Sequence, residues 1–393
     1  MRTIGVVTVA RSDYGIYLSL LRKIAADPDL RLRLIVGGMH LSPLYGLTVK
    51  DIESDGFPIA ERVAMLEPSD EPQAIAQSIG RGVIGFSQAY ARHRPDLLVV
   101  LGDRFEMYSA ALAALPFKLP LAHIHGGELT EGAIDDALRH SMTKLSHLHF
   151  VATQEYARRV EQLGEEPWRI TVSGAPSLDN LHSMPLLDRA ELESRLNVKL
   201  STAPLLVTYH PVTLEYEQTA WQVKELLAAL DELGLPVVFT MPNADTHSHV
   251  IVKLLQQYVQ THPSARLVEN MGAQAYFSLM SIAAAMVGNS SSGIIEAPSV
   301  GLPVVNIGTR QQGRVRAANV IDVGYERREV AHGIRRALAS EFRSSLKGLA
   351  NPCGDGHSAE RILRRLKDVP LDDRLIMKRF VDIDLRLPAG RSG

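Results

Sequence analysis

The chain has 393 residues, enough for one large or two ordinary domains with an ample core. Its formal net charge is −2, so no overall basic field favours nucleic acid or a membrane surface as a partner. Cys353 is the single cysteine, which excludes a disulfide within the chain and a zinc site built from several thiolates.

We expect a cytoplasmic protein. Residues 3–10 already have a strand pattern rather than the pattern of a secretory leader. No apolar run approaches the ~20 residues that a membrane-spanning helix needs.

Apolar runs of strand length alternate with amphipathic stretches of helix length along the whole chain. The predicted strands are residues 3–10, 31–37, 97–101, 120–124, 148–152, 170–172, 205–209, 236–240, 266–268, 284–287, 304–307 and 321–323. Near-continuous runs of Val, Ile and Leu are typical of parallel strands buried on both faces. Predicted helices such as 71–93 and 215–233 separate them. We therefore predict an α/β protein with doubly wound, Rossmann-like sheets.

The domain boundary is predicted between residues 173 and 201, where Gly174, Pro176, Pro185 and the polar stretch 201–204 interrupt the pattern. The predicted units are a first Rossmann-like domain, 1–180, a second one, 181–368, and a C-terminal helix and tail, 369–393. Two such domains would face one another across a cleft lined by the carboxyl ends of their strands.

Residues 288–296, Gly-Asn-Ser-Ser-Ser-Gly-Ile-Ile-Glu, follow an apolar strand and lead into a predicted helix. Such a turn is typical of phosphate binding, because glycine lets the backbone approach the anion and the helix N-terminus carries a partial positive charge. Ser290 and Ser291 add hydroxyl groups, and Arg310 and Arg314 supply enough positive charge for a diphosphate. An ordinary helix capped by serine is compatible with the same nine residues.

Polar residues also follow the strands of the first half. Arg11 comes after the first strand and is placed to meet a phosphate. Asp103 and Arg104 come after strand 97–101, where a carboxylate beside a cation is well placed for catalysis. The same pair is compatible with a helix cap and a surface cation.

The densest group of ionisable residues follows strand 120–124. His123 and His125 would share one strand face if the strand continued, and Glu128 and Asp135 come shortly after them. No HExxH-type spacing is present, so we predict no metal.

Two predicted strands of the second half are also followed by polar residues. His210 stands at the end of strand 205–209, and Asn243 follows strand 236–240. The sequence has neither a Gly-x-Gly-x-x-Gly nor a Walker motif, which argues against a nicotinamide cofactor and against ATP hydrolysis. A nucleotide-sugar enzyme fits these residues best, with glycosyl transfer and sugar epimerisation both open.

As an ordered set, the motifs resemble the hydrolysing UDP-N-acetylglucosamine 2-epimerases, which begin sialic acid synthesis. The stretches that carry the resemblance are 11–14, 102–106, 123–128, 132–136, 139–147, 210–211, 242–245, 288–296 and 306–311. The resemblance implies two domains of the GT-B type with the active site between them. It also implies a C-terminal helix that crosses back to the first domain, no cofactor or metal, and a homodimer or homotetramer.

The family's functional residues match individual positions of this chain. The resemblance implies that the diphosphate is bound by Arg11, Ser290, Ser291 and Arg310, the ribose by Glu296 and the nucleotide also by Asn243, with Asp103, Asp135 and His210 catalytic and Arg104 beside them. The first domain would then form the catalytic wall, and the second would hold UDP.

One position departs from the family pattern. Many members have glutamate where this chain has His125, and that glutamate belongs to the catalytic set. Either His125 or Glu128 would take its place, and a histidine with a pKa of ~6.5 can act as acid or base at neutral pH. The variant resembles the branch that acts on UDP-2,4-diacetamido-2,4,6-trideoxyhexose in legionaminic acid synthesis.

The predicted reaction converts UDP-N-acetylglucosamine and water into N-acetylmannosamine and UDP, by anti elimination to a glycal and then hydration. The alternatives are the same chemistry on the diacetamido sugar, a non-hydrolysing 2-epimerase, a GT-B glycosyltransferase, and a UDP-sugar-binding protein without turnover.

Overall fold

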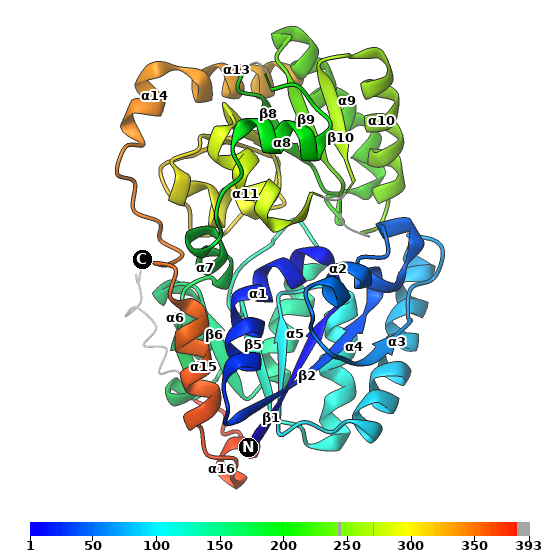
Figure 1. Cartoon of the computed structure of the whole chain (residues 1–393), viewed down its shortest axis with the longest axis vertical. Helices are drawn as coiled ribbons and strands as arrows, with labels where there is room; N and C mark the ends of the chain where they lie inside the picture. Colours follow the sequence, from blue (N-terminus) through cyan, green and yellow to red (C-terminus); the bar gives the residue numbers. More distant parts are fainter. Residues whose placement is uncertain (201, 243–244, 270, 383–393) are drawn as a thin grey trace, which may run out of the picture.

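The computed structural model describes residues 1–200, 202–242, 245–269 and 271–382. Two parallel β-sheets, each covered by helices, lie one above the other along the long axis of the molecule (Figure 1). The predicted fold class, two Rossmann-like domains that face a cleft, is confirmed.

The first sheet has seven strands in the order β3-β2-β1-β4-β5-β6-β7. Its strands are β1 (Arg2–Thr8), β2 (Leu30–Gly37), β3 (Ile59–Val63), β4 (Leu97–Leu101), β5 (Leu121–Ile124), β6 (Leu148–Val151) and β7 (Ile170–Val172). Its helices are α1 (Arg11–Ala26), α2 (Val49–Ser54), α3 (Pro72–Arg92), α4 (Phe105–Ala114), α5 (Asp135–Leu145) and α6 (Gln154–Gln162). The strand order reverses between β1 and β4, so their carboxyl ends diverge and leave a crevice.

The second sheet has six strands in the order β10-β9-β8-β11-β12-β13, with its reversal between β8 and β11. Its strands are β8 (Leu205–Thr208), β9 (Val237–Thr240), β10 (Ala265–Val268), β11 (Ala285–Gly288), β12 (Val304–Ile307) and β13 (Val320–Val323). Its helices are α8 (Arg189–Leu196), α9 (Thr219–Leu233), α10 (Ser248–Thr261), α11 (Gly272–Ile282), α12 (Ser292–Ile295), α13 (Arg327–Leu338) and α14 (Ser340–Ser345). Both crevices open toward the contact between the domains.

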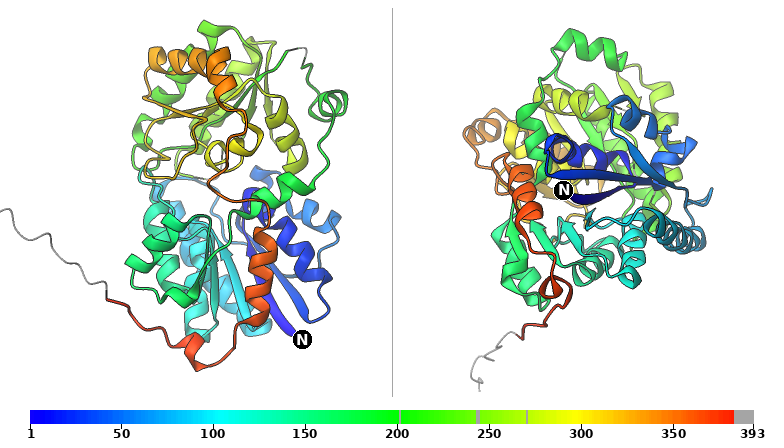
Figure 2. Two further views of the ribbon diagram at one scale, coloured as in Figure 1. Left: turned by 90° about the vertical axis from the view of Figure 1, so that its left-hand side faces the viewer. Right: turned by 60° about the horizontal axis from the view of Figure 1, so that its bottom comes forward.

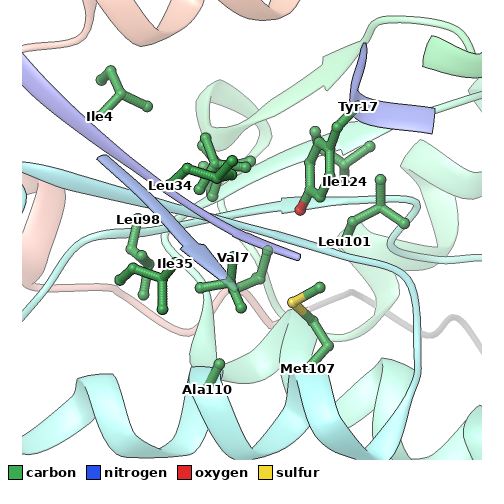
Figure 3. Close-up of a cluster of buried hydrophobic side chains, with 14 of the residues drawn as sticks. Ile4, Val7, Tyr17, Leu34, Ile35, Leu98, Leu101, Met107, Ala110 and Ile124 are labelled. Carbon is green, nitrogen blue, oxygen red and sulfur yellow. The ribbon is translucent and has the colours of Figure 1, made fainter. Parts of the chain in front are cut away.

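The core of the first domain forms because its strands carry apolar side chains on both faces of the sheet, and helices bury both faces. Ile4 and Val7 of β1, Leu34 and Ile35 of β2 and Leu98 of β4 are fully buried in one cluster (Figure 3). Within the described part of the chain, no helix is long and apolar enough to cross a membrane.

Two local predictions were wrong. Strand β3 was missed, because it is an edge strand whose central residues are charged or half exposed, and it lacks the continuous apolar run of a central strand. The helix predicted after the serine turn is the single turn α12, followed by a 3-10 helix at Ala297–Val300. Pro298 has no backbone N–H to continue an α-helix, so little helix dipole is available there.

The predicted boundary at residue 369 assigns residues up to 368 to the second domain. In the structure the chain has already returned to the first domain at residue 358. Helix α7 (Pro176–Ser183) leads out of the first domain, and α15 (Ser358–Asp368) runs back along it, beside the first sheet (Figure 2). Asp179 of α7 accepts the backbone N–H groups of Ser358 and Ala359 at 2.9 and 2.8 Å, which caps α15. The apolar stripe of α15 is Ala359, Ile362 and Leu366, and it packs in the first core. The short helix α16 (Asp373–Ile376) follows.

We predict that Ile362→Ala destabilises the first domain by ~2–5 kcal/mol, because a fully buried side chain is replaced by a cavity. The measurement is urea unfolding followed by tryptophan fluorescence, since Trp168 packs on the first core and Trp221 lies on α9 of the second domain. Arg364→Ala, on the exposed face of α15, is the matched control and should change stability by less than ~0.5 kcal/mol. Equal effects of the two substitutions would show that α15 contributes nothing to the first core.

Candidate active site

A deep cleft lies between the domains, where the crevices of the two sheets meet. It contains about 1460 Å³ of free space, including solvent at its mouth. Its lining includes these predicted site residues: Arg11, Asp103, Arg104, Asp135, His210, Ser290, Ser291, Glu296 and Arg310. His125 and Glu128 do not line it, and Asn243 lies outside the described residues.

Two carboxyl groups stand on the first-domain wall of the cleft. Asp103 follows β4 and forms an ion pair with the buried Arg139. Asp135 opens α5 and is buried. Burial, together with the nearby charges of Asp103 and Asp245, raises the pKa of Asp135 to about 7. The wall therefore pairs an ion-paired carboxylate with a carboxyl group that can hold a proton near neutral pH.

Arg104 links this wall to the second domain. Its Nη1 lies 3.1 Å from Asp245 Oδ1, and its Nε and Nη2 donate to the two carboxylate oxygens of Glu106 at 3.1 and 2.9 Å. All three side chains are buried, so a single guanidinium group is shared by two carboxyl groups away from water.

His125 does not share a strand face with His123, which corrects the prediction for these two residues. Strand β5 ends at Ile124, and His125 has a left-handed backbone with φ of +65°. His123 stays in the core, where its Nε2 lies 2.8 Å from the carbonyl oxygen of Gly102. Burial lowers the pKa of His123 to about 3, which makes it a neutral structural residue.

His125 and Glu128 form a buried pair behind the cleft. His125 Nδ1 lies 2.5 Å from Glu128 Oε1, and Glu128 Oε2 accepts from Arg314 Nη1 at 2.7 Å. Burial opposes ionisation of Glu128, but the charges of His125 and Arg314 outweigh it and hold its pKa well below the usual range. Arg314, expected beside a diphosphate, lines the cleft and also reaches across from the second domain to the first.

The second-domain wall is fixed at the ends of β8 and β11 by Asn289. Its Oδ1 accepts the N–H of His210 at 2.7 Å, and its Nδ2 donates to the carbonyl oxygen of His210 at 2.8 Å. Gly288 is required beside it, because a Cβ there would lie 2.0 Å from the carbonyl oxygen of Thr208. The amide thus locks the backbone of His210, a buried residue that lines the cleft.

Positive charge surrounds His210. Burial and the guanidinium groups of Arg310, Arg104 and Arg11 hold the pKa of His210 well below its usual value, so the ring is neutral. Arg310 Nη1 and Gln311 Nε2 both donate to the carbonyl oxygen of Asn289, at 3.2 and 2.8 Å. Arg11 crosses from the first domain and donates to the carbonyl oxygen of Glu269.

Glu296 is the one acidic group on the second-domain wall for which a role was predicted. Burial raises its pKa to about 7, and its Oε2 has no hydrogen-bond partner among the described residues. A buried oxygen of this kind is costly unless a ligand or water satisfies it.

A separate group, Asp70, Glu71 and His249, has ligand atoms within 4.8 Å of one another and could hold a cation. Asp70 already accepts from Ser248 Oγ and from the backbone and ring of His249. These three residues lie outside the lining of the cleft.

Comparison with known proteins decides the family. A family model described as UDP-N-acetylglucosamine 2-epimerase matches residues 22–367. The chain belongs to the hydrolysing UDP-N-acetylglucosamine 2-epimerase family, as its motifs predicted.

Two relatives match this epimerase over nearly their whole length. The GDP/UDP-N,N'-diacetylbacillosamine 2-epimerase (hydrolyzing) of Campylobacter jejuni is 40% identical over 385 residues, 97% of this chain and 99% of the relative. The UDP-N,N'-diacetylbacillosamine 2-epimerase (hydrolyzing) of Legionella pneumophila is 35% identical over 378 residues, 96% of this chain and 99% of the relative.

A solved structure supports the fold of the epimerase. The UDP-GlcNAc 2-epimerase of Neisseria meningitidis, crystallised with UDP-GlcNAc, matches with a TM-score of 0.80 and 18% identity, over 94% of this chain and 100% of that one. At this identity the match establishes the two-domain arrangement.

Three residues that contribute to the epimerase site were missed from the sequence. Asn289 lies inside the serine motif, but nothing in the sequence indicated that its side chain would bond the backbone of His210. Arg139 and Asp245 lay in the resembling stretches without an assigned role. Their partners, Asp103 and Arg104, are 36 and 141 residues away, so only the fold identifies the pairs.

We predict that Asp135→Asn raises thermal stability at pH 8 by ~2–4 °C and has a clearly smaller effect at pH 5. The raised pKa means that the folded protein keeps this carboxyl group protonated, so its contribution to stability is lost as pH rises from about 4 to about 7. Asparagine cannot ionise. The midpoint of thermal unfolding measures the effect, with Asp96→Asn at the opposite end of β4 as the control. Equal shifts at both pH values would contradict the raised pKa.

Proposed function

We propose that the protein is a hydrolysing 2-epimerase of UDP-2,4-diacetamido-2,4,6-trideoxyglucose, which is UDP-N,N'-diacetylbacillosamine, and that it releases UDP and the free 2-epimeric sugar. The similarity to the two relatives carries the proposal, because both are named for this sugar and align over nearly their whole length. Histidine at position 125 supports the same branch. UDP-N-acetylglucosamine, expected first from the motifs, has less support than its alternative.

Departure of UDP needs positive charge at the β-phosphate. Arg310 and Arg11 line the cleft with the half-buried hydroxyl groups of Ser290 and Ser291. We assign the diphosphate to these four groups, because cations already in place stabilise the charge that develops as the bond from C1 to oxygen breaks. Neutral His210 can add an N–H donor to a phosphate oxygen.

Glu296 is assigned to the ribose hydroxyls. Its buried Oε2 lacks a partner in the described structure, and a hydroxyl donor would satisfy it. This places the nucleoside along the second domain and the sugar toward the first.

The sugar then faces Asp103 and Asp135. In the first step a base removes the proton from C2, the electron pair forms the double bond between C1 and C2, and the C1–O bond breaks to release UDP. In the second step an acid returns a proton to C2 from the opposite face and water adds its oxygen to C1, while the proton that the water loses passes to the carboxylate left by the acid. We assign the base to Asp103, which is ion-paired with Arg139, and the acid to Asp135.

His125 and Glu128 were both candidates for proton transfer, and their place behind the cleft favours a positioning role instead. Glu128 holds Arg314, while Arg139 donates to the carbonyl oxygen of His125 at 2.7 Å as well as pairing with Asp103. The pair therefore supports two cations, one on each side of the cleft.

The test is to offer the UDP-2,4-diacetamido sugar and UDP-N-acetylglucosamine separately, in deuterated water that also contains oxygen-18. We expect release of UDP and of a free sugar with deuterium at C2 and oxygen-18 at C1, with higher kcat/KM for the diacetamido substrate. NMR and mass spectrometry identify the product. Preference for UDP-N-acetylglucosamine would overturn the substrate, and a UDP-linked product or an unlabelled sugar would overturn the hydrolytic elimination.

We predict that Asp103→Asn lowers kcat by ~10²–10⁴-fold, because the amide cannot accept a proton, and that UDP still binds. Steady-state kinetics and calorimetric titration with UDP separate the two effects. Asp96→Asn, at the amino end of the same strand, should keep kcat within about twofold. Full activity in Asp103→Asn would remove this residue from the mechanism.

A further inference from the structure

The second domain places a carboxylate of its own beside the acid–base wall of the first. Asp245 follows β9 and is buried, and within the described part of the chain it forms an ion pair with Arg104. Arg104 also pairs with Glu106, so one guanidinium serves two carboxylates. The negative charge of Asp245 is therefore incompletely compensated.

Asp245 and Asp135 face the same small space between the domains. That cavity is lined by Ile75, Phe105, Ile134, Asp135, Leu138, Thr213, Asp245 and Thr246. Four of its eight residues are apolar, so water screens the two carboxyl groups poorly. Charge on one of them disfavours charge on the other.

The turn that carries Asp135 is fastened to the second domain. Thr213 Oγ1 accepts the backbone N–H of Ile134 at 2.9 Å, at the N-cap of α5. Gly132 touches the loop after β12, where an added Cβ would lie 2.8 Å from Thr309 Oγ1 and 2.9 Å from the Cα of Arg310. In this arrangement the second domain therefore both holds the start of α5 and places Asp245 beside it.

The charges that face Asp135 come from both domains. Asp103 and Arg104 belong to its own domain, and Asp245 and Arg310 arrive with the second. On its own helix, Asp136 accepts the N–H of Thr130, and Arg139 is paired with Asp103.

Arg310 favours ionisation of Asp135, but on the proposed function a substrate diphosphate neutralises this arginine. Asp245 is then the second-domain charge left to act on Asp135.

We propose that Asp245 is a positioning residue that keeps Asp135 protonated while the domains are closed on substrate, so that the acid is loaded only in the closed cleft. The inference rests on the proposed function. It extends that function by assigning control of the acid to the opposite domain.

The test is the pH dependence of kcat for Asp245→Asn. With Asp135 as the acid, wild-type kcat falls as pH rises through the pKa of that group. Removing the charge of Asp245 should move this alkaline limb to lower pH by ~1 unit, so that kcat at pH 8 falls ~10-fold while kcat at pH 6 changes little. Asp245→Glu should restore the wild-type limb.

Asp70→Asn is the matched control, because Asp70 also joins the domains, through α10, and does not line the cavity shared with Asp135. Its alkaline limb should stay at the wild-type pH. Asp245→Ser, which keeps an acceptor for Arg104, replaces the asparagine variant if that one fails to fold. An equal loss of kcat at every pH, or no loss, in the folded variant would overturn the proposal.

Calorimetric titration with UDP gives a second readout that needs no turnover. In buffers of different ionisation enthalpy at pH 7.5, the wild type should take up a proton on binding UDP. The uptake should disappear in Asp135→Asn and shrink in Asp245→Asn. Undiminished uptake in Asp245→Asn would also count against the role of this residue. Failure of the proposed function can be told apart from failure of the role of Asp245. In the first case the wild type itself releases no sugar from either UDP-sugar.

Discussion

Pairs of buried charges that join the two domains are the constraint on which the rest of the structure depends. Glu128 pairs with Arg314, and Asp245 pairs with Arg104. A buried charge left without its partner costs several kcal/mol, so separating the domains must expose these groups to water. The closed cleft is therefore a specific arrangement rather than a loose contact of two surfaces. It is also the arrangement that brings the groups we assign to the diphosphate into one cleft with Asp103 and Asp135.

The charges near the domain contact also give Asp103 and Asp135 different surroundings, although both are aspartates. Asp103 has Arg139 beside it, while Asp135 has two other carboxylates within electrostatic reach. In the proposed reaction, environment rather than residue type thus suits one to accept a proton and the other to donate one. His125 and Glu128 contribute indirectly, since they hold the cations that border this pair.

The fold could be predicted from the sequence because its strands are buried on both faces and leave continuous apolar runs. Strand β3 and the single-turn α12 escaped prediction, since an edge strand and a proline-terminated turn break those patterns. Strand ends indicated which residues would meet, and nine of the predicted site residues line one cleft. Which of them touch the ligand space could not be predicted, because it depends on backbone direction at single residues, such as the positive φ of His125.

Helix α15 has a mechanical consequence. The chain passes between the domains twice, once after α7 and again before α15, and Asp179 ties the two passages together. Two adjacent connections between the domains favour a hinge motion about the line that joins them. They resist rotation of one domain about any other axis. Each opening of the cleft should then retrace one path and return every cross-domain pair to the same register. A chain that ends after α7 would lack α15, which packs against α1 in the first core. The first domain is therefore incomplete without the end of the chain.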